Sequence, residues 1–97
     1  MIKYLEKENL IDLVKEGIHI VDFYADWCGP CKMLGSVLEN MEEVNIIKIN
    51  TDTHQELASE YGVMSIPTLI FFKDGKEMRK EIGFKDEEQL RNILETL

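Results

Sequence analysis

The sequence has few cysteines and prolines and no long apolar run. Its 97 residues include two cysteines, two prolines and one tryptophan. Two cysteines are too few for the disulfide framework of a small secreted domain, and no apolar stretch approaches the roughly 20 residues of a membrane-spanning helix. The opening MIKYLEKENL has no apolar core followed by a small-residue cleavage site. We therefore expect no secretory signal and a cytoplasmic protein.

Positive charge is also scarce. The chain has 11 Lys and Arg residues against 19 Asp and Glu residues, which gives a formal net charge of −8. Because an acidic surface is repelled by phosphates and anionic lipids, we expect neither nucleic acid nor membranes as partners. The length fits one domain over residues 1–97 and leaves no room for a second. We expect this domain to be a monomer.

Apolar periodicity divides the chain into alternating helices and strands. Helical spacing predicts helices over residues 8–17, over the stretch after the cysteines, over 53–62, and from residue 86 to the end. Runs of β-branched and aromatic residues predict strands over residues 2–5, 18–25, 44–49, 67–72 and 76–82. The chain has no internal repeat and no linker-like segment.

Turn and cap signals extend this pattern to a fold class. Thr53 and Glu56 have the spacing of a capping box, and Asp86 can cap the last helix. Asp74-Gly75 predicts a hairpin, which adds an antiparallel edge to strands that are joined through helices and so run parallel. We predict an α/β fold, a central mixed sheet of four to five strands flanked by helices on both faces. The pattern does not give the order of the strands.

The segment Cys28-Gly29-Pro30-Cys31 lies between a predicted strand and a predicted helix. Pro30 suits the first helical turn, where its missing N–H is no loss. Cys28 then lies at the helix N-terminus, where unpaired N–H groups and the helix dipole favour a thiolate. Cys31 lies one turn on, near enough to close a disulfide. Thiol–disulfide exchange needs this arrangement, an exposed activated thiol followed by a sheltered one.

A single C-x-x-C pair is also compatible with half a zinc site or with an incidental pair. A structural zinc site needs four ligands from Cys and His. The chain has no second cysteine pair, and His19 and His54 lack ligand spacing. We therefore expect no metal. These residues alone leave the redox pair and the incidental pair open.

Two segments resemble the signatures of the thioredoxin family. VDFYADWCGPCKM (21–33) is similar to the family's active-site segment, Trp-Cys-Gly-Pro-Cys-Lys. MSIPTLIFF (64–72) resembles its Ile-Pro-Thr segment, whose proline follows a cis peptide bond. The Gly-Pro dipeptide between the cysteines is similar to thioredoxins, whereas glutaredoxins usually carry Pro-Tyr and disulfide isomerases Gly-His. The resemblance covers essentially the whole chain and implies the thioredoxin fold.

The resemblance implies a protein-disulfide reductase that acts by dithiol–disulfide exchange. Cys28 resembles the attacking nucleophile and Cys31 the resolving thiol, and the pair forms the redox-active disulfide with no bound cofactor. The implied partners are protein disulfide substrates and a thioredoxin reductase that recycles the chain. Two alternatives are a specialised glutaredoxin-like reductase and a thioredoxin-fold binding module in which redox chemistry is incidental.

Two charged residues lie within apolar predicted strands, Asp22 in IHIVDFYA and Lys48 in NIIKIN. Taken alone, Asp22 could point into water from a strand edge. By resemblance it is the family's buried carboxylate beneath the disulfide, and Lys48 is its partner across neighbouring strands. Burial should raise the pKa of Asp22 and let it exchange a proton with Cys31.

The resemblance also implies a substrate-docking surface around the cysteines. A single tryptophan is usually core, but next to the cysteines we predict that Trp27 covers the disulfide and contacts the target. We predict a cis Ile66–Pro67 bond that leaves the backbone of Ile66 free to pair with an extended substrate segment. The residues predicted to bind substrate are Trp27, Gly29, Pro30, Ile66, Pro67 and Gly83.

Four residues depart from the family's common choices. They bear on the choice of partner rather than on the chemistry, and they are Tyr24, Ser36, Ser65 and Phe84.

Overall fold

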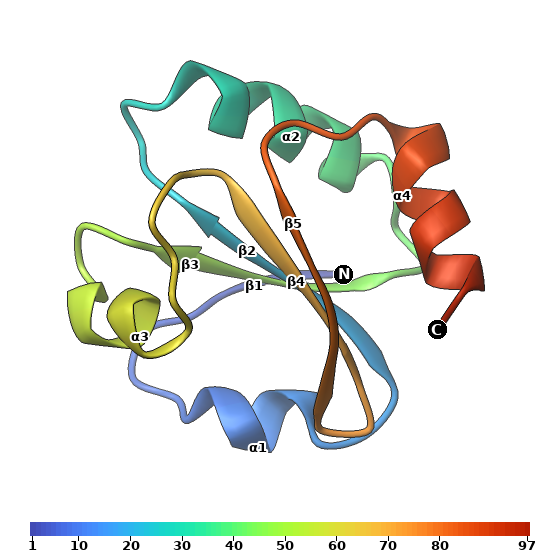
Figure 1. Ribbon diagram of the computed structural model, residues 1–97, viewed down its shortest axis with the longest axis horizontal. Helices are drawn as coiled ribbons and strands as arrows, with labels where there is room; N and C mark the ends of the chain where they lie inside the picture. Colours follow the sequence, from blue (N-terminus) through green and yellow to red (C-terminus); the bar gives the residue numbers. More distant parts are fainter.

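A central sheet lies between two layers of helices in the computed structural model, which describes residues 1–97 (Figure 1). The strands are β1 (Ile2–Tyr4), β2 (Ile18–Tyr24), β3 (Asn45–Asn50), β4 (Thr68–Lys73) and β5 (Lys76–Ile82). The helices are α1 (Leu10–Val14), α2 (Gly29–Glu39), α3 (Gln55–Glu60) and α4 (Glu87–Glu95). The predicted order of elements is therefore confirmed. No helix combines the length and apolar character needed to cross a membrane.

The sheet has five strands in the order β1-β3-β2-β4-β5. β3 pairs parallel with both β1 and β2, whereas β4 is antiparallel to β2 and β5 is antiparallel to β4. The predicted mixed sheet is thus confirmed, with β2 at its centre.

The inference that helix-joined strands run parallel is wrong for β4. The connection from β3 to β4, residues 51–67, includes the short helix α3. It begins and ends at the same edge of the sheet, because Asn50 is opposite Tyr24 of β2 and Thr68 is opposite Phe23 of β2. β4 therefore starts at the edge where β3 ends and runs in the opposite direction.

The two faces of the sheet bury two separate apolar cores, as alternation along the strands requires. On one face, residues such as Val21 and Phe23 pack with Leu10 and Val14 of α1 and with Ala58 of α3. On the opposite face, β2 packs its alternate residues beneath α2 and α4. The residues buried there include Ile20, Leu34, Leu38, Phe71 and Leu90. Figure 1 shows the same division, with α1 and α3 on one side of the sheet and α2 and α4 on the other.

The starts of α1 and α3 differ from the predicted ones. α1 begins only at Leu10, because the Asn9 side chain accepts the N–H of Ile11 at 3.0 Å and acts as N-cap. The predicted capping box of Thr53 and Glu56 is wrong. The hydroxyl of Thr53 instead donates to the carbonyl of Asn50 at 3.3 Å, and α3 starts after His54 without a side-chain cap.

The predicted cap and hairpin in the C-terminal third of the chain are both confirmed. Asp86 caps α4 and forms a capping box with Gln89. Asp74 and Gly75 form the turn between β4 and β5, with φ of 50° and 83°, and this left-handed region explains the glycine.

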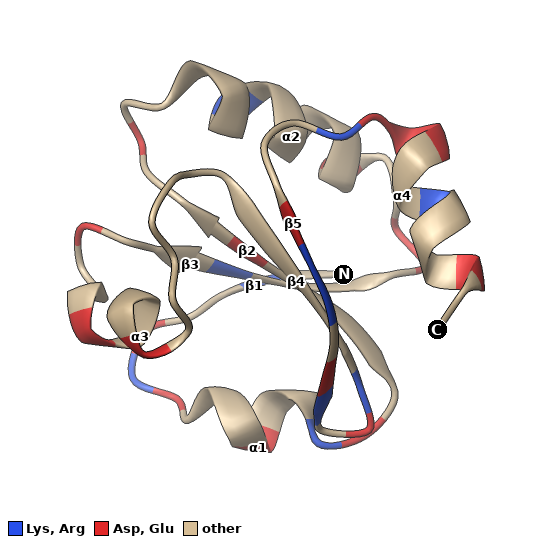
Figure 2. Ribbon diagram, in the orientation of Figure 1, with Lys and Arg blue, Asp and Glu red and all other residues tan.

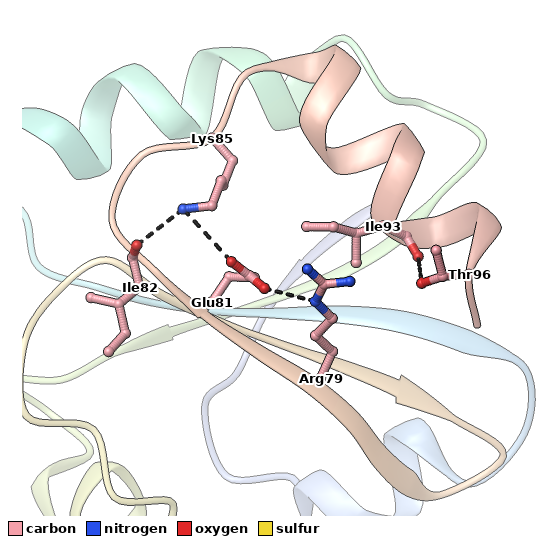
Figure 3. Close-up of polar contacts among 6 residues, drawn as sticks. All are labelled: Arg79, Glu81, Ile82, Lys85, Ile93 and Thr96. Carbon is pink, nitrogen blue, oxygen red and sulfur yellow. Dashed lines mark hydrogen bonds and ion pairs between the residues drawn. The ribbon is translucent and has the colours of Figure 1, made fainter.

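The edge strand β5 is tied to the loop that leads to α4 (Figure 3). The carboxylate of Glu81 accepts a hydrogen bond from Arg79 Nε at 2.7 Å and lies 3.9 Å from Lys85 Nζ. The same Lys85 ammonium donates to the carbonyl of Ile82 at 3.1 Å. These contacts hold the end of β5 beside the start of the loop that carries Gly83.

Candidate active site

The two cysteines form a disulfide at the start of α2. Cys28 is the N-cap residue, with φ −92° and ψ 112°, and its sulfur accepts the N–H of Cys31 at 3.3 Å. Pro30 lies in the first turn, as predicted, where a missing N–H costs nothing. The sulfur of Cys28 therefore faces the positive end of an 11-residue helix. In the reduced protein this position stabilises a thiolate.

Both cysteines are nearly buried in the oxidised protein. Cys28 is 6% exposed and Cys31 2%, because Ala25, Tyr24 and Ile66 pack around them. The prediction of an openly exposed Cys28 is therefore wrong for this disulfide form. The sulfurs differ instead in what lies beside them.

Cys28 opens on a hollow of about 550 Å³ that contains no charged residue. Four of the residues predicted to bind substrate line it, namely Trp27, Gly29, Pro30 and Ile66. The remaining lining residues come from the end of β3, from α3 and from the loop before β4, and they are Thr51, Ala58, Val63, Met64 and Ser65. An uncharged cleft of this kind suits an apolar polypeptide segment.

The loop before β4 forms one wall of this hollow. The Ile66–Pro67 peptide bond is cis, as predicted. The carbonyl oxygen of Ile66 lies 3.9 Å from Cys28 Sγ. A disulfide sulfur has no hydrogen to donate, so this contact is a close approach, and only the reduced thiol could turn it into a hydrogen bond. The carbonyl of Pro67 accepts the N–H of Gly83 at 2.8 Å, and this bond joins Gly83 to the same loop.

Trp27 is 71% exposed and forms another wall of the hollow. Its indole Nε1 donates to the carboxylate of Asp52 at 3.0 Å. Asp52 was not predicted as a site residue. A signal was present, because Asp52 lies two residues after the end of β3, and the carboxyl ends of the parallel strands β2 and β3 meet at the same edge of the sheet.

Asp22 and Lys48 face each other across β2 and β3, as predicted. The side chain of Asp22 is fully buried, and Lys48 Nζ lies 3.7 Å from its Oδ2, too far for a hydrogen bond. Neither carboxylate oxygen has a hydrogen-bond partner. Burial raises the pKa of Asp22 from 3.8 to about 6, and the positive charge of Lys48 offsets only part of that rise.

Cys31 opens on a different, smaller cavity. This space of about 170 Å³ lies on the side of the disulfide that faces Lys48. Its lining residues are Tyr4, Tyr24, Ala25, Asp26, Cys31, Lys32 and Lys48. Tyr4 was not predicted as a site residue, since nothing in the sequence of β1 marks it as close to the cysteines.

No group of three or more His, Cys, Asp and Glu side chains is placed to hold a metal ion. A polar depression of about 600 Å³ lies over α3 and includes Asp52, Glu56 and Glu60, but neither cysteine borders it. The chemistry therefore centres on the disulfide. A disulfide at a helix N-terminus, beside an uncharged cleft, defines the class of protein as a thiol–disulfide oxidoreductase.

Comparison with known proteins gives the family. Residues 1–96 match the family model described as Thioredoxin. The thioredoxin of Chlamydia caviae is 47% identical over 98 residues, covering 97% of this chain and 96% of that protein. The thioredoxin of Bacillus subtilis is 46% identical over 84 residues, covering 81% of each chain.

A solved structure agrees. A mutant thioredoxin from Halobacterium salinarum superimposes with a TM-score of 0.90 at 39% identity, covering 98% of this chain and 88% of that chain. The chain belongs to the thioredoxin family. It is a protein-disulfide reductase whose redox centre is the Cys28–Cys31 disulfide, and the family uses this disulfide in place of a bound cofactor.

Proposed function

We propose that the two cysteines act in a fixed order. The reduced Cys28 thiolate attacks one sulfur of a target disulfide, forming a mixed disulfide and releasing the first target thiolate. Cys31, after losing its proton, then attacks the sulfur of Cys28, closes the Cys28–Cys31 disulfide and releases the second target thiolate. The target gains two electrons and this chain loses two. The observation that supports this order is that only Cys28 borders the uncharged hollow.

Asp22 supplies the proton step for Cys31 in this proposal. A carboxyl group with a pKa of about 6 can accept a proton near neutral pH and return it. Cys31 and Lys48 line the same small cavity, and Lys48 is the charge partner of Asp22. Lys48 therefore keeps the carboxylate available as a base despite its burial.

The target segment binds in the hollow beside Cys28. Trp27, Gly29, Pro30 and Ile66 line this hollow. Pro67 and Gly83, which are hydrogen-bonded to each other, lie outside its lining and contact the target where it continues past Ile66. The segment lies extended and pairs with the backbone of Ile66, as peptides do when they add to an exposed edge. Because the hollow carries no charge, apolar residues around the target cysteine are favoured.

The protein acts as a single domain over residues 1–97, as a monomer in the cytoplasm. A thioredoxin reductase returns its disulfide to the dithiol. Figure 2 supports the exclusion of nucleic acid and anionic membranes as partners, because acidic residues are spread over α1, α3, α4 and the loops. The net charge of −8 disfavours both.

Single-cysteine variants test the proposed order. Cys28→Ser should abolish reduction of a protein disulfide when thioredoxin reductase is supplied in excess, because no nucleophile borders the hollow. Cys31→Ser should still attack but accumulate mixed disulfides that gel analysis without reductant detects. In the reduced wild type at pH 7, iodoacetamide should label Cys28 much faster than Cys31.

Equal labelling of the two thiols, or a Cys31→Ser variant that traps no target, would contradict this order and favour the binding-module alternative. In that case a double Cys28→Ser, Cys31→Ser variant should retain the biological role. Turnover with glutathione alone in place of the reductase would favour the glutaredoxin-like alternative.

A further inference from the structure

Three charged or aromatic side chains lie in a row across the central strands. In the register of the sheet, Tyr4 of β1 is opposite Lys48 of β3, and Lys48 is opposite Asp22 of β2. Tyr24, two residues after Asp22, points to the same face of β2. The Tyr4 and Tyr24 rings meet edge to face, with their centroids 6.3 Å apart. The two rings therefore stand at the mouth of the cavity that reaches Cys31.

The ammonium of Lys48 lies over both rings. Its Nζ is 4.5 Å from the centroid of Tyr24 and 5.7 Å from that of Tyr4, both within the range of a cation–π contact. Lys48 is only 8% exposed and makes no hydrogen bond, so water solvates its charge poorly. The faces of the two rings replace part of that lost solvation.

The helix α2 leaves room for the Lys48 ammonium at Gly35. A Cβ atom at Gly35 of α2 would come within 3.3 Å of Lys48 Nζ, so a larger residue there would press on the ammonium. Asp26 and Lys32 line the same cavity as the rings. Burial and the charge of Asp26 raise the pKa of the Tyr24 phenol, which therefore stays neutral and can present its ring to a cation.

We propose that Tyr4 and Tyr24 form an aromatic clamp that holds the Lys48 ammonium beside Asp22, and that the clamp thereby sets the pH range over which Cys31 resolves mixed disulfides. The inference rests on the proposed proton exchange between Asp22 and Cys31. Tyr4 and Tyr24 are positioning residues, because they act on the reaction only through Lys48.

Leucine and phenylalanine variants of Tyr4 and Tyr24 separate the effect of the aromatic ring from that of the hydroxyl group. In Tyr4→Leu and Tyr24→Leu the replaced side chain stays apolar but one cation–π contact is lost, so the ammonium moves toward water and its charge stabilises the Asp22 carboxylate less. We expect the titration midpoint of the Asp22 carboxyl, followed by NMR in the oxidised protein, to rise by about half a pH unit or more. The upfield ring-current shift of the Lys48 ε-protons should become smaller as well, more so in Tyr24→Leu, because the Tyr24 ring is the nearer one. Tyr4→Phe and Tyr24→Phe keep a ring and should keep both signals.

A double-mutant cycle tests whether the rings act through Lys48. In a Lys48→Met background the leucine substitutions should no longer move the Asp22 midpoint. A midpoint that is unchanged or lower in the single leucine variants would overturn the clamp, as would an equal shift in the Lys48→Met background.

The pH profile of product release connects the clamp to the reaction. In a rapid-mixing experiment with the reduced protein, the midpoint for the Cys31-dependent step should rise with the Asp22 midpoint in the leucine variants. A profile that stays fixed while Asp22 shifts would overturn the proposed link between clamp and resolution. An unchanged rate in Asp22→Asn would instead remove the proton step of the proposed function and leave the NMR evidence for the clamp intact.

Discussion

Replacing Asp22 by asparagine should remove the contribution of this carboxyl group to the pH dependence of the protein's stability. Burial raises the pKa of Asp22 in the folded protein from 3.8 to about 6. The folded state therefore binds the proton more tightly than the unfolded chain. The stability that this proton confers is fully present below pH 3.8 and is lost as the pH rises to about 6.

The gap between these two pKa values corresponds to about 3 kcal/mol of unfolding free energy. Asparagine has the same shape as the protonated acid and never ionises, so it avoids this loss. We expect Asp22→Asn and wild type to be equally stable near pH 3.5. By pH 7.5 the variant should be more stable by about 2–3 kcal/mol, against a typical total of about 5–15 kcal/mol.

Urea denaturation of both oxidised proteins across this pH range measures the difference. The slope of the unfolding free energy against denaturant should be the same for the two proteins, so that the shift in midpoint reports stability alone. A stability difference that does not change between pH 3.5 and 7.5 would refute the reasoning. It would mean that water or Lys48 already compensates the buried carboxylate.

Three further positions test the turn after β5, the cap of α4 and the hydrogen bond of Trp27. Gly83 has φ of 90°, so Gly83→Ala should lower stability by about 1 kcal/mol, whereas Gly29→Ala, without a positive φ or a close neighbour, should change it little. Asp86→Ala removes the N-cap of α4 and should lower the free energy of unfolding by about 1 kcal/mol. Asp86→Asn retains an N-cap, so in thermal unfolding only the alanine variant should melt at a lower temperature than the wild type. Asp52→Ala removes the hydrogen-bond acceptor of the Trp27 indole, so it should raise KM for a protein disulfide about fivefold and shift the fluorescence of the only tryptophan. Asp52→Asn can still accept this hydrogen bond and should change neither KM nor the fluorescence.

Local patterns predicted the parts of the fold that depend on local interactions. The order of elements, the Asp74-Gly75 hairpin and the cap at Asp86 all depend on neighbours within a few residues, and all three are confirmed. The position of the cysteine pair at a helix start follows in the same way from Pro30 and the strand before it. Of the local signals, the capping box at Thr53 failed, because Asn50 offers its hydroxyl a competing carbonyl.

Non-local features could not be predicted in the same way. The reversed direction of β4 depends on the edge of the sheet at which the connection from β3 ends, and the strand order depends on which strands pair. Family resemblance supplied the Asp22–Lys48 contact across β2 and β3. It did not supply Tyr4, whose place over Lys48 arises only when β1 pairs with β3 in this register.

The two cysteines differ in the cavity that each sulfur borders rather than in how exposed each residue is. At 6% and 2% exposed, neither sulfur is open to bulk water in the disulfide. Residues three apart on a helix lie about 60° apart around its axis, and here that angle separates an uncharged hollow from a cavity with two lysines and an aspartate. In the proposed mechanism the target chain docks in the first space, whereas Cys31 exchanges its proton on the side of the second, where Lys48 lies beside Asp22. The proposed order, attack by Cys28 before closure by Cys31, follows from this difference in surroundings.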